Sequence, residues 1–368
     1  MSNITEYIIS NILGYFEVVR SNGFNKYGYL KAFGYKKKAK FVMANTEYQD
    51  ISELSLPVIH GYNNCGIVFQ GPVTKNKNLT IGSILLLRNI YPDIKIVLST
   101  WQKELNEKEK KILSDNHCYY LENESCPPED KGKGRKIGHL ANQLKSSICG
   151  IHLLKQYGVD YVMKIRSDLR IYKYDFLPYF INLLNSFPCG INCMNKRLLC
   201  VSFSNNLIYC PFHLSDFIWF GNIDDMAKMY SIQPRSSDDL ETIRNKSSES
   251  LSKHSRIFHE LINHPYEKLL NSDWFSNLKL DFSFYSLFHE EAYIIYKFLL
   301  SIGFLTDDLS NPIDIYWDFI KKGIIVVDEA DINVYWAKYG YSLLRQSTLF
   351  SNSQLTKSRW LDIMLKSD

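Results

Sequence analysis

The chain has 368 residues, of which 45% are hydrophobic and 22% are charged, and its formal net charge is +4. This length and composition suit one large α/β domain, or two smaller ones, with a sizeable core. The nearly balanced charge argues against a dedicated nucleic-acid-binding protein, in which basic residues dominate. The eight cysteines include no CxxC pair, so we expect neither a zinc site nor a disulfide framework.

Residues 1–60 differ in composition from the rest of the chain. Apolar residues at helical spacing are followed by a basic and aromatic stretch, 26–41, which is typical of a solvated surface segment or of peripheral contact with anionic lipid. No apolar run is long enough to cross a bilayer, and the first residues lack the basic region of a signal peptide. We therefore expect a cytoplasmic protein, and the stretch 26–41 leaves peripheral contact with the inner face of the cell membrane as an open alternative.

From residue 66 onward, short apolar runs alternate with helical patterns. Strands are predicted at 66–70, 94–101, 118–124 and 160–168, with helices around 81–87 and 137–154. This succession of βαβ units predicts a mainly parallel sheet with helices on its faces. In such sheets ligands bind beyond the carboxyl ends of the strands.

After residue 175 the strand signals are sparser and aromatic residues are frequent. Strands are predicted at 198–204, 216–221 and 323–329, and helices at 224–230 and 289–303. The polar tract 234–256 has no run that could bury itself, so we expect it to be a surface loop. No repeat or linker divides the chain. We expect a single domain over 61–368, with a donor half at about 61–175 and an acceptor half at about 176–340.

Three charged residues alternate in the predicted strand 160–168. Lys164, Arg166 and Asp168 would share one face of a strand, which a plain core strand would not tolerate. An acid at the end of such a strand could hold Mg²⁺ or Mn²⁺ together with substrate phosphates. The two cations could neutralise phosphate or simply pair with Asp168. A single acid also leaves a metal-independent site open.

Two further features are polar groups expected near the same edge. Asn142, Gln143, Ser146 and Ser147 form a polar band on an otherwise apolar helix. The turn after the first strand contains Gly71 and offers backbone N–H groups. Neither GxGxxG nor GxxxxGK[ST] occurs, so neither a dinucleotide fold nor a P-loop is supported.

Five separated motifs occur in an order that resembles a known family. They are "IVFQGPV", "YPDIKIVLSTW", "ANQLKSSICGIHLL" with "YGVDYVMKIRSDLRI", "FHLSDFIWFG" and "EEAYI", over roughly residues 65–300. Together they resemble the WavE family of lipopolysaccharide and capsule synthesis proteins. The resemblance implies an α/β fold of GT-A-like type. Its mainly parallel central sheet would be flanked by helices, with extra N-terminal and C-terminal helical elements.

The resemblance also implies a donor site for a nucleotide sugar. The residues it places there are Gln70, Gly71, Pro72, Ser99, Thr100, Trp101, Asn142, Gln143, Lys164, Arg166 and Asp168. Asp168 would act where other GT-A enzymes carry an Asp-x-Asp motif, as the metal ligand. Asn142 and Gln143 depart from the Arg-Gln pair of the family, which puts the nucleotide contacts in doubt.

Glycosyl transfer with inversion needs a carboxylate that takes the proton from the acceptor hydroxyl. Glu291 is the first candidate and Glu290 the second, although acids also favour helix N-termini for structural reasons. Asp216 is the third, because Trp219 beside it could pack on a sugar, or could be core. His289, next to Glu290, could add a metal or acceptor contact.

These features predict a hexosyltransferase that moves a sugar from a nucleotide diphosphate, by resemblance a UDP-sugar, to a lipopolysaccharide or capsular glycan. Two alternatives remain open. One is a capsule sugar-phosphate transferase, which would release a nucleoside monophosphate. The other is a non-catalytic scaffold of a glycan-synthesis complex.

Overall fold

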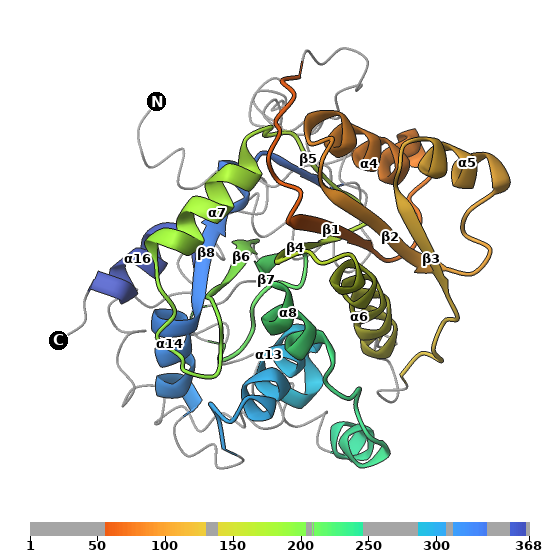
Figure 1. Ribbon diagram of the computed structural model, residues 1–368. Helices are drawn as coiled ribbons and strands as arrows, with labels where there is room; N and C mark the ends of the chain where they lie inside the picture. Colours follow the sequence, from red (N-terminus) through yellow and green to blue (C-terminus); the bar gives the residue numbers. More distant parts are fainter. Residues whose placement is uncertain are drawn as a thin grey trace, which may run out of the picture.

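The computed structural model describes residues 56–129, 139–203, 208, 210–245, 286–306, 312–336 and 354–365. Within them, seven strands form one sheet in the order β3-β2-β1-β4-β7-β6-β8 (Figure 1). The strands are β1 (Cys65–Gln70), β2 (Lys95–Trp101), β3 (Tyr119–Asn123), β4 (Tyr161–Arg166), β6 (Leu198–Ser202), β7 (Ile218–Asn222) and β8 (Ile324–Asp328). All neighbours pair in parallel except β7, which is antiparallel to both β4 and β6.

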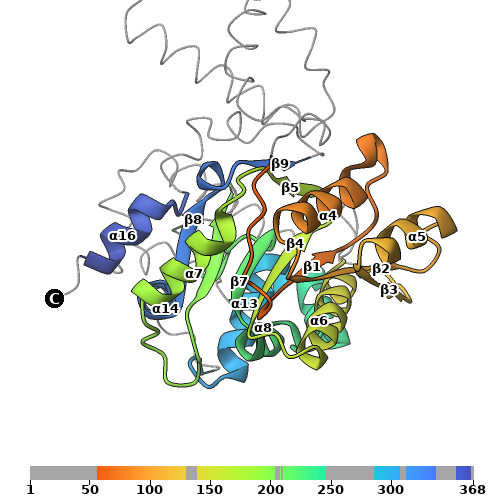
Figure 2. The same ribbon diagram turned by 45° about the horizontal axis from the view of Figure 1, so that its top comes forward.

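The helices are α4 (Leu79–Ile90), α5 (Glu107–Asp115), α6 (Leu140–Gln156), α7 (Phe176–Ser186), α8 (Ile223–Tyr230), α13 (Glu290–Ser301), α14 (Pro312–Gly323) and α16 (Lys357–Leu365), with short 3-10 turns η2 (Asn76–Asn78) and η3 (Glu329–Asp331). In both ribbon views α4 and α7 lie on one side of the sheet, and α6, α8 and α13 lie on the other (Figure 2). The predicted α/β class, with a mainly parallel sheet flanked by helices and extra helices near the C-terminus, is confirmed.

The central strand β1 is buried along its whole length, as its continuous apolar run predicts for a parallel strand covered on both faces. Helix α6 packs closely on it through two glycines. A Cβ added at Gly150 would lie 2.5 Å from Val68 Cγ1, and one added at Gly66 would lie 2.7 Å from Leu154 Cδ1. This close packing fixes α6, and the polar side chains it carries, against the end of the sheet.

A second, two-stranded sheet joins distant parts of the chain. Strand β5 (Leu169–Ile171) follows β4 after a two-residue turn, and it pairs antiparallel with β9 (Val334–Trp336), with Leu169 opposite Trp336. Neither strand is predicted from the sequence, because three residues are too few for a recognisable alternation. The pairing brings residue 336 next to the end of β4.

Two expectations need comment. The predicted loop 234–256 is wrong for 237–245, which is helical, and Ile243 in it is fully buried. The rest of that tract, and residues 1–55 with the stretch 26–41, lie outside the described residues, so the membrane-contact hypothesis stays a prediction. The division of the chain into donor and acceptor halves also stays a prediction. In the described ranges we find no helix with the length and apolar character needed to span a membrane.

Candidate functional site

The candidate site lies at the carboxyl edge, the sheet edge at which β1, β2, β3 and β4 end. Since β7 runs in the opposite direction, its first residues lie at this edge too. Ile218 pairs with Ile165, and the backbone N–H of Arg166 donates to the carbonyl oxygen of Phe217 at 3.1 Å. The segment that precedes β7 therefore meets the end of β4, where parallel α/β sheets bind ligands.

The turn after β1 lies at this edge, as predicted, but its N–H groups are already bonded. Gly71 has φ +114°, a conformation that favours glycine, and its N–H donates to the carbonyl of Ser99 at 3.1 Å. The N–H of Val73 donates to Glu104 Oε2 at 3.2 Å. The carbonyl of Pro72 accepts from the Ser167 hydroxyl at 2.6 Å. The expectation that this turn presents free N–H groups to phosphate is wrong for these two residues.

The predicted donor-site residues at the end of the second strand lie in that strand, as predicted for 94–101. Ser99, Thr100 and Trp101 are the last residues of β2, and the first two are fully buried. Asn123 Nδ2 donates to Ser99 Oγ and to the carbonyl of Thr100, both at 2.9 Å. The Thr100 hydroxyl is buried and has no hydrogen-bond partner among the residues that the structure describes. These side chains hold the ends of β2 and β3 together.

The polar band of α6 makes contacts within the protein. The Asn142 side chain accepts from the N–H of Cys126 at 2.7 Å and donates to its carbonyl at 3.0 Å, so it fixes the segment after β3. Gln143 Nε2 donates to the carboxylate of Asp216. Gln70 Nε2 donates to Ser146 Oγ at 2.9 Å. The structure thus brings Gln143 to the site's acids, whereas Asn142 and Gln70 serve as local supports.

Lys164 is fully buried and lies behind Asp216. Its ammonium donates to the carbonyl oxygen of Asp216 and lies 3.8 Å from Oδ2 of the same residue. Burial lowers the pKa of Lys164 to about 8, against the opposing effect of the Asp216 carboxylate. At pH 7 the buried group remains mostly a cation, next to a carboxylate that is itself only 9% exposed.

Arg166 and Asp168 form a two-point ion pair. Arg166 Nε donates to Asp168 Oδ1 at 3.0 Å and Nη2 donates to Oδ2 at 2.9 Å, while Trp336 Nε1 also donates to Oδ2 at 2.9 Å. The guanidinium carbon lies 4.7 Å from the ring centroid of Phe217 and 5.7 Å from that of Trp336. Strand β4 ends at Arg166, so Asp168 is not part of the strand. Asp168 reaches Arg166 because the chain turns after β4.

Glu291 is the acid with the most perturbed protonation at this edge. Burial first, and then the nearby carboxylates of Asp216 and Glu290, raise its pKa to about 7. Its Oε2 lies 3.9 Å from His213 Nε2, and burial lowers the pKa of His213 to about 4. At neutral pH the histidine is uncharged and Glu291 is close to half protonated.

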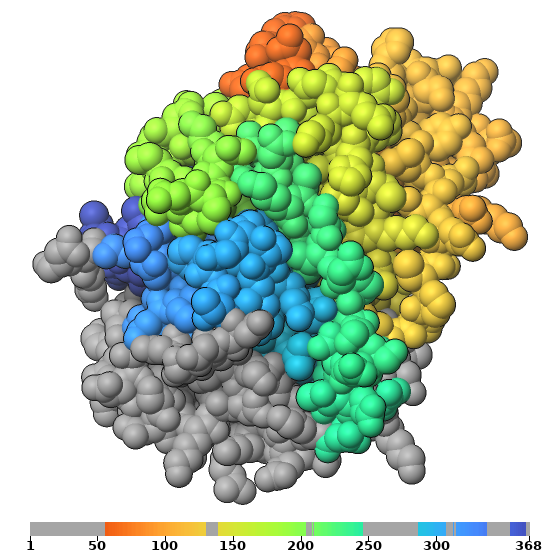
Figure 3. Space-filling model, turned by 60° about the horizontal axis from the view of Figure 1, so that its bottom comes forward, coloured from red at the N-terminus to blue at the C-terminus, as the bar shows by residue number. Residues whose placement is uncertain are grey.

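A buried arginine holds the start of α13, which carries both glutamates. Arg235 donates to Glu129 Oε2 at 2.6 Å, to the carbonyl of Leu287 and, at 3.1 Å, to the carbonyl of Phe288. It also lies 3.8 Å from Glu290 Oε1. Figure 3 shows this side of the molecule, where residues of the green 210–245 region run between the blue α13 and the yellow α6. The local sequence around Arg235, a polar tract, gave no sign of this role.

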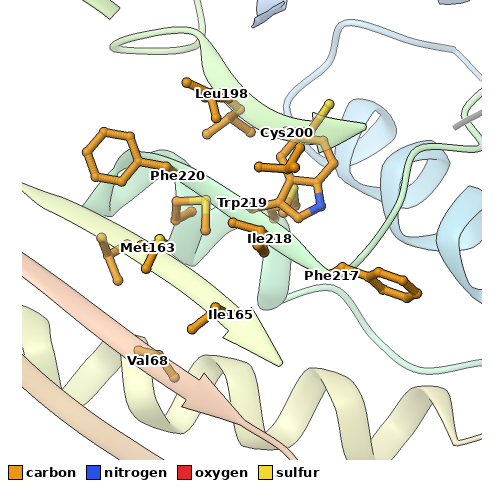
Figure 4. Close-up of a cluster of buried hydrophobic side chains, with 14 of the residues drawn as sticks. Val68, Met163, Ile165, Leu198, Cys200, Phe217, Ile218, Trp219 and Phe220 are labelled. Carbon is orange, nitrogen blue, oxygen red and sulfur yellow. The ribbon is translucent and has the colours of Figure 1, made fainter. Parts of the chain in front are cut away.

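Trp219 belongs to the core. It is 1% exposed, its Nε1 donates to the carbonyl of Ser215 at 2.7 Å, and it packs among apolar side chains of β4, β6 and β7 (Figure 4). The hypothesis that its face packs on a sugar is therefore wrong. Phe217 and Trp336, which sequence reasoning missed, lie at the edge beside Arg166.

The residues at the edge do not form a ready metal site. Among the described residues, no group of three or more His, Cys, Asp and Glu side chains could hold a metal ion. Both carboxylate oxygens of Asp168 already accept hydrogen bonds from the Arg166 fork and the Trp336 indole. This arrangement does not fit Asp168 as the ligand of Mg²⁺ or Mn²⁺.

Comparison with known proteins gave three results. No curated protein matches the chain. Two solved structures align weakly. A cytidylyltransferase from Leptospira borgpetersenii serovar Hardjo-bovis shares 11% identity at a TM-score of 0.29, with 52% of this chain and 73% of that chain covered. A protein assigned as a glucose-1-phosphate thymidylyltransferase, from Bacillus anthracis and in complex with a sucrose, shares 9% identity at a TM-score of 0.27, with 53% of this chain and 84% of that chain covered.

The family comparison covers most of the described sheet. A family model described as WavE lipopolysaccharide synthesis matches residues 65–286, which is more than half of the 368 residues. The match includes Lys164, Arg166, Asp168 and Asp216, and it ends just before Glu290. The chain belongs to the WavE lipopolysaccharide synthesis family.

Proposed function

We propose that this protein is a hexosyltransferase that moves a sugar from a nucleotide-diphosphate donor, most simply a UDP-sugar, to a lipopolysaccharide or capsular glycan acceptor with inversion. Membership of the WavE family supports a role in lipopolysaccharide synthesis. The transfer itself, the GT-A-like type of fold and the glycan or glycolipid acceptor are parts of the proposal. The cytoplasm is the proposed location, because nucleotide sugars are the donors.

The observation that carries the proposal is the Glu291 carboxyl group, with its pKa of about 7, beside buried cations at the carboxyl edge. A general base works best when its pKa lies near the working pH. Ionised Glu291 would take the proton of the acceptor hydroxyl as that oxygen attacks the anomeric carbon. Of the two other candidates, Glu290 lies near Arg235 and Asp216 accepts from Gln143.

The cations supply the second requirement of the reaction. A departing nucleoside diphosphate gains negative charge, and positioned positive groups stabilise that charge in the transition state. Arg166 keeps 30% exposure of its side chain at the edge. Lys164 is buried behind Arg166 and adds a second positive charge beneath the edge. Gln143 and Lys164 hold Asp216 so that it faces Glu291 and Arg166.

The test is product analysis on the purified full chain, with a panel of UDP-, GDP-, CDP- and dTDP-sugars and a lipopolysaccharide core acceptor. We expect one donor to release its nucleoside diphosphate in step with acceptor glycosylation. Glu291→Gln should remove this activity, whereas the matched neighbour Glu290→Gln should keep most of it. Release of a nucleoside monophosphate would instead identify a sugar-phosphate transferase. If calorimetry detects no nucleotide binding, the protein is not an enzyme of this kind.

A further inference from the structure

The pair Arg166–Asp168 places a cation where a metal ion would have to bind. Asp168 accepts three hydrogen bonds, from Arg166 Nε at 3.0 Å and from Arg166 Nη2 and Trp336 Nε1 at 2.9 Å each. A carboxylate offers about four acceptor directions on its two oxygens, so little capacity is left. A divalent cation on Asp168 would also lie next to a guanidinium that is already in contact, and like charges repel at this range.

The contacts of Arg166 fix its guanidinium in a position that suits anion binding. Two aromatic rings, Phe217 and Trp336, lie 4.7 and 5.7 Å from its guanidinium carbon, and Asp168 fixes its Nε and Nη2. In the part of the chain that the structure describes, Nη1 makes no hydrogen bond, and the side chain is 30% exposed. A planar guanidinium with free N–H groups is the side chain best suited to phosphate.

We propose that Arg166 binds the diphosphate of the donor directly, without a divalent cation, and that Asp168 is a positioning residue for Arg166 and not a metal ligand. This inference rests on the proposed function. In the transfer, the bond between the anomeric carbon and the β-phosphate oxygen breaks, and its electron pair stays on that oxygen, next to Arg166. The acceptor oxygen forms the new bond to carbon, and its proton goes to Glu291.

Trp336, from a distant part of the chain, contacts both Arg166 and Asp168. Its indole N–H donates to the oxygen of Asp168 that also receives Nη2, and its ring packs on the guanidinium. Trp336 is in β9, which pairs with β5, the strand that directly follows Asp168, so the indole lies next to Asp168. Asp168, the indole and Phe217 thus all contact the guanidinium, and the side chain keeps 30% exposure.

The test measures UDP binding to the full chain by calorimetry, first with EDTA and then with Mn²⁺, and repeats it with inorganic pyrophosphate as a probe without the nucleoside. We expect the UDP affinity in EDTA to be within about threefold of that in Mn²⁺, since a direct arginine contact needs no metal. Arg166→Lys should weaken UDP binding about tenfold or more in both buffers, because it loses the fork. The exposed Lys108→Ala is the matched control and should bind as the wild type does.

Asp168→Asn tests the positioning role, because asparagine keeps the shape and an oxygen for the indole. We expect weaker UDP binding by about the same factor with and without Mn²⁺, and a raised KM for the donor with the KM for the acceptor unchanged. Circular dichroism and the melting temperature without ligand show whether the variant is folded. If Asp168→Asn melts early, Trp336→Phe, which removes one hydrogen bond from Asp168, replaces it.

The outcomes separate the two proposals. UDP binding that appears only with Mn²⁺, and that Asp168→Asn abolishes while Arg166→Lys keeps it, would make Asp168 a metal ligand. The inference would then be wrong and the glycosyltransferase proposal would stand. No binding of any nucleotide under either condition would instead overturn the proposed function itself.

Discussion

Glu291 has a pKa of about 7 and lies near Asp216, Arg166 and His213. If it is the base, only its ionised form takes the acceptor proton. Transfer under kcat/KM conditions should therefore rise with pH, with a midpoint near the pKa of about 7, and level off above it. The measurement is a pH series of initial rates from 5.5 to 9. A flat profile through pH 7 would exclude Glu291 as the base.

The same residue should lower stability at high pH. Its folded pKa of about 7 lies above its ordinary value of 4.5, so the folded state favours the protonated form. Burial of the ionised Glu291 therefore lowers the free energy of unfolding above pH 7. This loss of stability disappears as the pH falls from 7 to 4.5. Converted at 1.36 kcal/mol per pH unit, the penalty is at most about 3 kcal/mol, and the 22% exposure of the side chain reduces it.

Glu291→Gln should consequently unfold at higher urea concentration than the wild type at pH 8, and the two proteins should converge below pH 4.5. Urea titrations at pH 4 and pH 8 make the comparison. A variant that is less stable than the wild type at both pH values would show that the carboxylate contributes favourable contacts that outweigh its burial.

At the scale of single residues, the sequence predicted which charges gather but not their partners. Arg166 and Asp168 are two positions apart, so their proximity follows from the local pattern. Trp336, by contrast, is 168 residues away from Asp168, and no local signal connects them. His213 and Arg235 were missed for the same reason, since each acts on a residue from a distant segment.

The start of α13 depends on the buried Arg235, an interaction between elements. Arg235→Ala would leave Glu129, 8% exposed, without its guanidinium, and an uncompensated buried charge costs about 3–5 kcal/mol. We expect a loss of this size in the free energy of unfolding by urea. Glu241→Ala, an exposed acid in the helical stretch that follows, is the control and should change it by less than about 0.5 kcal/mol. A loss below about 1 kcal/mol for Arg235→Ala would contradict the role of Arg235 in holding the start of α13.

Elements with strong periodicity were the ones predicted correctly. The runs that become β1, β2 and β8 are mainly apolar, as burial on both faces of a parallel sheet requires, and the run that becomes β4 is interrupted by Lys164 and Arg166. Two kinds of element were not predicted from the sequence. Short strands such as β5 and β9 are fixed only by each other. The helical stretch 237–245 is polar because most of its side chains face solvent, and Ile243 is its buried residue.

At the scale of the whole molecule, the C-terminal helix α16 packs back onto the sheet and its neighbours. Trp360 is 1% exposed, its ring centroid lies 5.0 Å from that of Phe187, the residue that follows α7, and its Nε1 donates to the carbonyl of Ile320 in α14 at 3.3 Å. Trp360→Ala should lower the free energy of unfolding by about 3–5 kcal/mol.

Leu365, which is 80% exposed in the same helix, provides the control, and Leu365→Ala should have almost no effect. Urea unfolding followed by circular dichroism measures both variants. Equal, small losses would mean that α16 contributes little to the stability of the fold.

The pairing of β9 with β5 has a consequence for the newly made chain. A ribosome releases Lys164, Arg166 and Asp216 long before it releases Glu291, and Trp336 comes later still. Until α13 emerges the cationic end of β4 lacks Glu291, and until β9 emerges and pairs it also lacks the indole. The growing polypeptide therefore passes through a stage at which the proposed anion-binding residues are made and the proposed base is not.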